Sequence, residues 1–271
     1  MREKHLIGFT YQHEDAREAV EASCEKVCVL KPKQSVVSVY FPQKKRSYIY
    51  YNNQFDLKKG DLVFVDGKMA GLSGFVEAIN YNFRIKLSDY KRVISVANTD
   101  IHGNFYMTES FALTFEKNAL EKDKIRTWFF PPVCEEDEFV RGSDDAAFPL
   151  EDIETIIARS SVPGKTYECY REENVLYLSL HDTAGYAIVI GSCPYEVEFV
   201  YRSGDISDLV CSCYCCNDCS HKYAVLLELC DIFKIIQDRF ENEYEDSGYF
   251  AAVRKDLLMN FAGREKGNLH F

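Results

Sequence analysis

Residues 211–221 read Cys211-Ser-Cys213-Tyr-Cys215-Cys216-Asn-Asp-Cys219-Ser-His221. These eleven positions hold five of the eleven cysteines and one of the six histidines of the chain. The spacing is a C-x-C pair, a loop of five residues and a C-x-H pair. Three thiolates and one imidazole form the closed tetrahedral set that zinc takes in structural sites. We therefore predict that one Zn²⁺ ion is bound by Cys211, Cys213, Cys219 and His221.

Other uses of these cysteines remain open. Two pairs, Cys213/Cys216 and Cys216/Cys219, have the C-x-x-C spacing of redox motifs, and a disulfide cluster would use the same thiols. Redox motifs sit in alternating strand and helix patterns, which the surrounding sequence lacks. The odd number of cysteines and the absence of a signal peptide favour a reducing compartment. Within the zinc hypothesis, Cys215 or Cys216 could replace one of the four ligands; otherwise both are spare thiols of the loop.

The same residues resemble a SWIM zinc finger, whose pattern is C-x-C, a variable loop, and C-x-H followed by an apolar helix. The run after His221 supplies such a helix, and residues 187–197 are similar to the paired strands that precede the metal site. The resemblance covers about residues 165–235 and places the four predicted ligands on the ligand positions. The loop departs from the family pattern in being short, in its extra thiols and in Tyr214, where proline is frequent. Family members contact protein or nucleic acid, so the resemblance implies a binding module and names no reaction.

Apolar patterns around this stretch predict the elements of the C-terminal half. A short helix is expected over 150–160 and ends at Pro163-Gly164. Four strands of a meander should follow at 167–170, 175–180, 186–190 and 195–201, because turn-forming residues separate them. An apolar stripe predicts a long helix from His221 to about Asn242, and a final helix is expected over 249–261.

The N-terminal half changes from a helical to a strand-like period. Residues 13–27 carry apolar positions at helical spacing, and Cys24 and Cys28 share one face of that helix as ordinary buried thiols. β-Branched and aromatic runs separated by turn residues predict strands at 36–41, 47–51, 62–65, 75–80, 82–87, 92–96 and 105–107. Such short strands favour a small β-barrel or sandwich, and the pattern Lys59–Val65 with Gly74–Ile79 is weakly similar to SH3-like barrels. A charged helix over 114–128 should close this region.

These patterns predict an α+β chain with four segments. We expect an N-terminal helical segment at 1–32, a β-rich, barrel-like domain at 33–130, an acidic linker with a short helix at 131–164, and a SWIM-type zinc-finger domain with C-terminal helices at 165–271. The acidic stretch 134–145 lacks apolar periodicity and is the expected connector.

Charge is distributed unevenly over the 271 residues. Residues 1–130 hold 20 Lys and Arg against 16 Asp and Glu, a net of +4, whereas the remainder holds 12 against 27, a net of −15. The acidic balance of the zinc-bearing half counts against duplex binding there, because phosphate contacts need Lys and Arg. Apolar runs fall short of the roughly 20 residues that a membrane span needs. We expect a cytoplasmic protein that does not enter a membrane.

Nothing in the sequence predicts an enzyme. The phosphate-binding loop G-x-x-x-x-G-K-[ST], the G-x-S-x-G motif and the H-E-x-x-H motif are all missing, so we assign no catalytic residue. Four protein ligands would also leave the zinc no position for a catalytic water. His5, His13, His102, His181 and His270 stand outside any motif.

Two functions remain. We predict a zinc-binding interaction protein, in which the Cys₃His site supports a module that contacts a protein partner. The alternative is binding of single-stranded DNA or RNA by a basic and aromatic face of the barrel, through Lys44, Lys45, Arg46, Tyr48 and Tyr50. Against this alternative, aromatic residues of a strand are usual core residues and a charged turn is usually solvated.

Overall fold

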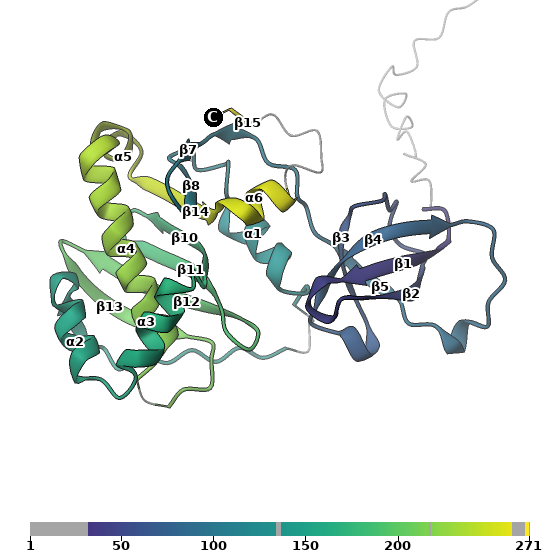
Figure 1. Ribbon diagram of the computed structural model, residues 1–271, viewed down its shortest axis with the longest axis horizontal. Coiled ribbons are helices and arrows are strands. Elements are labelled where there is room, and N and C mark those ends of the chain that lie inside the picture. Colours follow the sequence, from purple (N-terminus) through teal and green to yellow (C-terminus); the bar gives the residue numbers. More distant parts are fainter. Residues whose placement is uncertain (1–31, 134–136, 217, 262–268, 271) are drawn as a thin grey trace, which may run out of the picture. The chain divides into compact units, whose positions relative to one another are not determined.

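The computed structural model describes residues 32–133, 137–216, 218–261 and 269–270 (Figure 1). The helix predicted over 13–27 and the thiols Cys24 and Cys28 lie outside these residues, as does all of segment 1–32 except Pro32. Helices and antiparallel sheets are mixed along the described chain, which confirms the α+β class.

The smaller sheet has five antiparallel strands in the order β2-β1-β4-β3-β5. Its members are β1 (Ser35–Phe41), β2 (Arg46–Asn52), β3 (Leu62–Val65), β4 (Ser73–Asn80) and β5 (Val93–Val96). Alternate residues of β1 face its core, where Val37, Val39 and Phe41 are fully buried. A small barrel or sandwich was predicted here, and no closed barrel is seen in the described residues. The two edges of the sheet are joined by a single isolated bridge, between Tyr51 of β2 and Arg92, the residue before β5. The strand expected at 82–87 is also absent, and a short 3₁₀ turn follows at Leu87–Asp89.

The larger sheet has eight antiparallel strands in the order β7-β8-β14-β10-β11-β12-β13-β9. Its members are β7 (Tyr106–Met107), β8 (Phe111–Thr114), β9 (Ala147–Pro149), β10 (Val175–His181), β11 (Ala184–Ile190), β12 (Pro194–Arg202), β13 (Asp205–Cys211) and β14 (Tyr249–Arg254). β6 (Gly103–Asn104) pairs separately with β15 (Leu269–His270). β7 and β8 therefore belong to the larger sheet, although they lie inside the predicted segment 33–130.

Six α-helices accompany these sheets in the described residues: α1 (Lys122–Phe129), α2 (Ile153–Arg159), α3 (Pro163–Arg171), α4 (Ser220–Arg239), α5 (Glu241–Ser247) and α6 (Lys255–Phe261). The helix expected over 150–160 is present as a 3₁₀ turn followed by α2. The helix expected over 114–128 is shorter, because residues 115–121 form a turn that buries Ala119 and Leu120. The long helix expected to reach Asn242 ends at Arg239, and α5 begins after a break at Phe240.

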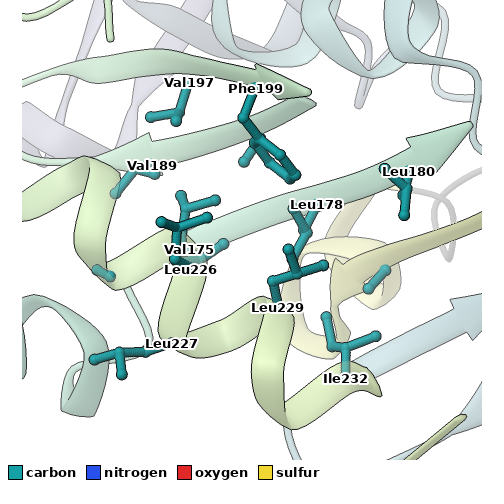
Figure 2. Packing of buried hydrophobic residues seen from close by; sticks show 14 of the residues in the cluster. Val175, Leu178, Leu180, Val189, Val197, Phe199, Leu226, Leu227, Leu229 and Ile232 are labelled. Atoms are coloured by element: carbon teal, nitrogen blue, oxygen red, sulfur yellow. The ribbon is translucent and has the colours of Figure 1, made fainter. Parts of the chain in front are cut away.

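One face of the larger sheet packs against α4. Figure 1 shows α4 lying across the strands, and Figure 2 shows its inward residues Leu226, Leu229 and Ile232 among the side chains of β10, β11 and β12. Leu226 and Leu229 are fully buried, and burial of each such side chain stabilises the fold by roughly 1.5–3 kcal/mol. The helix that begins at the predicted metal site is thus fixed to the sheet along its length.

The opposite face of the same sheet is buried as well. Trp128 of α1 and Phe261 of α6 pack there in a second core. Residues of β14 alternate between the two cores: Phe250 and Ala252 face the α4 side, whereas Tyr249, Ala251 and Val253 face the other. The predicted helix over 249–261 was therefore wrong in its first half. A strand buried on both faces lacks the polar alternation that identifies a half-exposed strand.

The strand predicted at 167–170 was also wrong, because these residues belong to α3. Pro163 occupies the first turn of that helix, where proline is favoured since its missing N–H is not needed. Thr166 and Cys169 are buried on α3, which packs against α4. The remaining strands of the predicted meander are present as β10, β11 and β12, and β13 extends the meander to Cys211.

Candidate metal centre

The predicted ligands come from the end of one strand and the start of one helix. Cys211 is the last residue of β13 and pairs with Val197 of β12. Ser212 continues this pairing, because its N–H donates to the Glu196 carbonyl and its Oγ accepts from the Glu196 N–H, each at 2.9 Å. Cys219 is the N-cap residue of α4, and His221 lies in the first turn. The loop between them therefore has to close only the gap between a fixed hairpin and a fixed helix.

The four ligand atoms lie within 4.8 Å of one another. Nδ1 of His221 is 3.9 Å from Sγ of Cys211 and 3.8 Å from Sγ of Cys219, and the sulfurs of Cys213 and Cys219 are 3.4 Å apart. Tetrahedral zinc, with bonds of about 2.3 Å to sulfur and about 2.0 Å to nitrogen, places its ligand atoms roughly 3.5–3.8 Å from one another. The separations therefore suit a tetrahedral metal ion, and these four residues could hold one.

A disulfide does not explain this cluster. A sulfur–sulfur bond is about 2.05 Å long, far shorter than the separation between Cys213 and Cys219. All eight cysteines within the described part of the chain are free thiols. Only Cys219 of the four predicted ligands is fully buried, and the other three are half-buried.

The protons of the cluster are shared unequally. The hydrogen bond from Cys211 is the largest of the effects that lower the pKa of the Cys219 thiol, which falls to about 3. The same contact is the main cause that raises the pKa of Cys211, and the hydrogen bond with Cys219 raises the pKa of His221. A metal ion bound by these residues would take the place of the shared protons, because metal binding to thiols and imidazole releases their protons.

Two residues outside the predicted ligand set hold the imidazole of His221. The Tyr195 ring lies beside it, with ring centroids 4.7 Å apart and an interplanar angle of 31°. Gly191 lies close to its Nε2, and a Cβ atom at residue 191 would be 2.8 Å from Nε2. Both residues belong to the β11–β12 hairpin. The ring is thus oriented with Nδ1 toward the three sulfurs, and the sequence gives no sign of these contacts because they join segments some 30 residues apart.

Asp218 fixes the second half of the loop. Its carboxylate accepts hydrogen bonds from the N–H of Ser161 at 2.6 Å and from the hydroxyl of Tyr223 at 2.9 Å. These bonds lower the pKa of Asp218, and burial followed by the bond to Asp218 raises the pKa of Tyr223 to about 12. The loop is thereby tied to the turn between α2 and α3. This role was not foreseen, because Ser161 is distant in sequence.

The tip of the loop faces solvent. Tyr214 is 96% exposed, and Cys215 and Cys216 are exposed. The two alternative ligands that the sequence left open, Cys215 and Cys216, are not among the residues whose ligand atoms lie within 4.8 Å of one another. A further thiol, Cys169 of α3, is buried in the core on the α4 side, and burial raises its pKa to about 11.

The residues predicted for the nucleic-acid alternative divide into two groups. Lys44, Lys45 and Arg46 are exposed at the turn between β1 and β2. Tyr50, however, is 5% exposed and packs edge-to-face against Phe41, and burial raises its pKa to about 12. Tyr48 is half-buried against the same ring. The cations are gathered on the surface, whereas the Tyr50 ring is held in the core, where a base could not stack on it.

Comparisons with known proteins add no assignment: no family model, curated protein or solved structure matches this chain. Among the described residues, no helix has the length and apolar character that a membrane crossing requires.

Proposed function

We propose that this chain is a zinc-binding interaction protein, in which a structural zinc ion holds the β12–β13 hairpin to the start of α4. The observation that supports this proposal is the group formed by Cys211, Cys213, Cys219 and His221, whose ligand atoms all lie within 4.8 Å of one another and are close enough to surround one metal ion. The resemblance to SWIM zinc fingers supports zinc over other ions. Four protein ligands fill the coordination sphere, which favours a structural role over a catalytic one.

Zinc occupancy is tested on the purified protein and on ligand variants. Protein made under reducing, zinc-replete conditions should hold one zinc ion per chain by elemental analysis. His221→Ala should lose most of it, because a three-ligand site with one open position binds zinc less tightly. The variant His181→Ala is the matched control, since His181 is exposed and lies outside the cluster. Wild-type protein without zinc would contradict the proposal.

We place the partner surface on the loop that the zinc would fix. Tyr214 extends from this loop into solvent, and tyrosine is enriched in protein interfaces. The apolar stripe of α4 is not available to a partner, because Leu226, Leu229 and Ile232 are buried in the core. A protein partner that contacts this loop should therefore bind only when zinc holds the loop in place.

Site-specific crosslinking tests this surface. A photo-crosslinking amino acid at position 214, introduced in the native cells, should give a discrete protein adduct that mass spectrometry identifies. The same amino acid at Met259, which is 54% exposed on α6, is the control for surface reactivity. The adduct should be lost when His221→Ala is combined with the position-214 probe. Equal adducts from both positions, or an adduct that persists without zinc, would refute the zinc-dependent interface.

The alternative is single-stranded nucleic-acid binding, which rests on the exposed cations Lys44, Lys45 and Arg46. Retention on single-stranded DNA should then fall steeply with salt, and alanine at these three positions should abolish it. The control for loss of positive charge is alanine at Lys58 and Lys59, which are exposed in the segment between β2 and β3. A chain that shows no retention at low salt excludes this alternative.

A further inference from the structure

A cavity of about 660 Å³ lies between α6, the β11–β12 hairpin and the turn that joins β1 to β2. Its apolar lining includes Phe75, Phe129, Leu176, Ile190, Leu257 and Phe261. Pockets for small molecules have volumes of roughly 300–1,000 Å³ and are mostly apolar with a few polar groups. The cavity therefore has the size and the lining of a small-molecule site.

The apolar side chains around this cavity are incompletely covered. Five hydrophobic residues pack against the second core and are only partly buried: Phe75, Phe129, Phe130, Ile190 and Leu257. All of them except Phe130 line the cavity. The ring of Phe261 connects two of them, with its centroid 5.9 Å from that of Phe75 and 6.2 Å from that of Phe129. A ligand with an apolar chain would remove this surface from water, which is favourable.

The charge around the cavity has one sign. Among the described residues that line it, Lys44 is the only charged one, although Asp and Glu outnumber Lys and Arg by 43 to 32 in the chain. Lys44 is exposed and takes part in no ion pair with another described residue, and Lys45 and Arg46 add positive charge to the same turn. An anionic group of a ligand is therefore attracted to Lys44, and no carboxylate of the lining repels it.

We propose that this cavity binds a fatty acid, with the alkyl chain against the apolar side chains and the carboxylate beside Lys44. The apolar lining fits the chain, and the single lysine distinguishes an acid from a neutral or cationic ligand. Cys193 also lines the cavity and is exposed, so its thiol reports whether the cavity is occupied. The site does not depend on the proposed zinc ion, because none of the four predicted zinc ligands belongs to the lining.

Calorimetric titration of the delipidated, full-length chain with octanoate and decanoate tests binding, at concentrations below micelle formation. Decanoate should bind about 15-fold more tightly, because each buried methylene contributes about fourfold. Decyltrimethylammonium has the same chain with a cationic head and should bind more weakly than decanoate. Equal affinities for octanoate and decanoate would overturn the apolar site. Tighter binding of the cation would overturn the choice of an acid.

Two pairs of matched variants assign the charge. Lys44→Met should weaken decanoate binding by up to about fivefold, which is the effect of losing one exposed ion pair, whereas Lys58→Met should leave it unchanged. Asn260→Asp adds a carboxylate to the lining with little change in volume and should also weaken binding. Its control is Asn82→Asp, at an exposed position outside the lining. Equal effects of variants and controls would overturn the assignment.

Alkylation of Cys193 locates the ligand. N-ethylmaleimide should modify this thiol readily in the delipidated chain and more slowly at saturating decanoate. Tryptic peptides separate Cys193 from the thiols of residues 211–219, because Arg202 lies between them. Protection by phosphatidylserine vesicles without protection by decanoate would mean that a membrane lipid binds, which overturns the free acid. A thiol that is unreactive in the delipidated chain would mean that protein covers the cavity, which also overturns the proposal.

Discussion

Substitution of Gly191 by alanine should weaken zinc binding without touching a ligand. A Cβ atom at this position would lie 2.8 Å from Nε2 of His221 and 3.0 Å from Cε2 of Tyr195. Ordinary contacts between such atoms are about 3.5 Å, so the imidazole would have to move by roughly 0.7 Å. The ring has little room to do so, because Tyr195 lies against it and Nδ1 has to stay near the sulfurs.

The cost follows from overpacking, which destabilises by about 1–3 kcal/mol. Since about 1.4 kcal/mol corresponds to a factor of ten, zinc affinity should fall roughly 5-fold to 150-fold. Competition with a chromophoric zinc chelator at neutral pH measures this change. Gly164→Ala is the control, because no atom lies within 4 Å of a Cβ built there. Unchanged affinity in Gly191→Ala would show that the contact with His221 does not orient the ligand.

Cys215→Ser and Cys216→Ser should each retain zinc by elemental analysis, whereas Cys219→Ser should lose it; zinc loss in either loop variant would change the ligand set. Chelation should lower amide-exchange protection most in β12, β13 and the start of α4, which meet at the site, and should leave β1 and β2 protected, because the five-stranded sheet holds no ligand. Equal loss of protection in β1 and β2 would contradict this. Burial, followed by the charges of neighbouring carboxylates, raises the pKa of Glu228 from 4.5 to about 7. The folded state therefore holds this proton more tightly than the unfolded state, and the free energy of unfolding should fall as the pH rises from about 5 to 8. In urea unfolding of the zinc-saturated protein, Glu228→Gln should remove about 3 kcal/mol of this loss, and a pH profile equal to that of wild type would refute the prediction.

The gathering of the four candidate metal ligands could be predicted from the sequence because the spacing that brings them together is local. A C-x-C pair at a strand end and a C-x-H pair at a helix start lie only a few residues apart, so spacing alone restricts where their side chains can meet. The contacts of Gly191 and Asp218 join the loop to a distant hairpin and to the α2–α3 turn. No local pattern encodes such contacts.

The errors in the fold have the same origin. Ala251 and Ala252 favour a helix in isolation, but their segment is paired on both sides by β8 and β10 and buried on both faces. Tyr167 and Tyr170 favour a strand, yet the segment forms α3, which buries Thr166 and Cys169 against the rest of the fold. In both cases long-range packing outweighed a local propensity of less than about 1 kcal/mol per residue.

The zinc assignment itself is tested most directly by X-ray absorption at the zinc edge of the purified, zinc-loaded protein. The coordination shell should contain three sulfur atoms at about 2.3 Å and one nitrogen at about 2.0–2.1 Å, with the outer-shell pattern of an imidazole. In zinc-loaded His221→Cys protein, the coordination shell should contain four sulfur atoms. A shell of four sulfurs in the wild-type protein would mean that Cys215 or Cys216 binds the zinc in place of His221. A shell of oxygen and nitrogen without sulfur would contradict the Cys₃His site altogether.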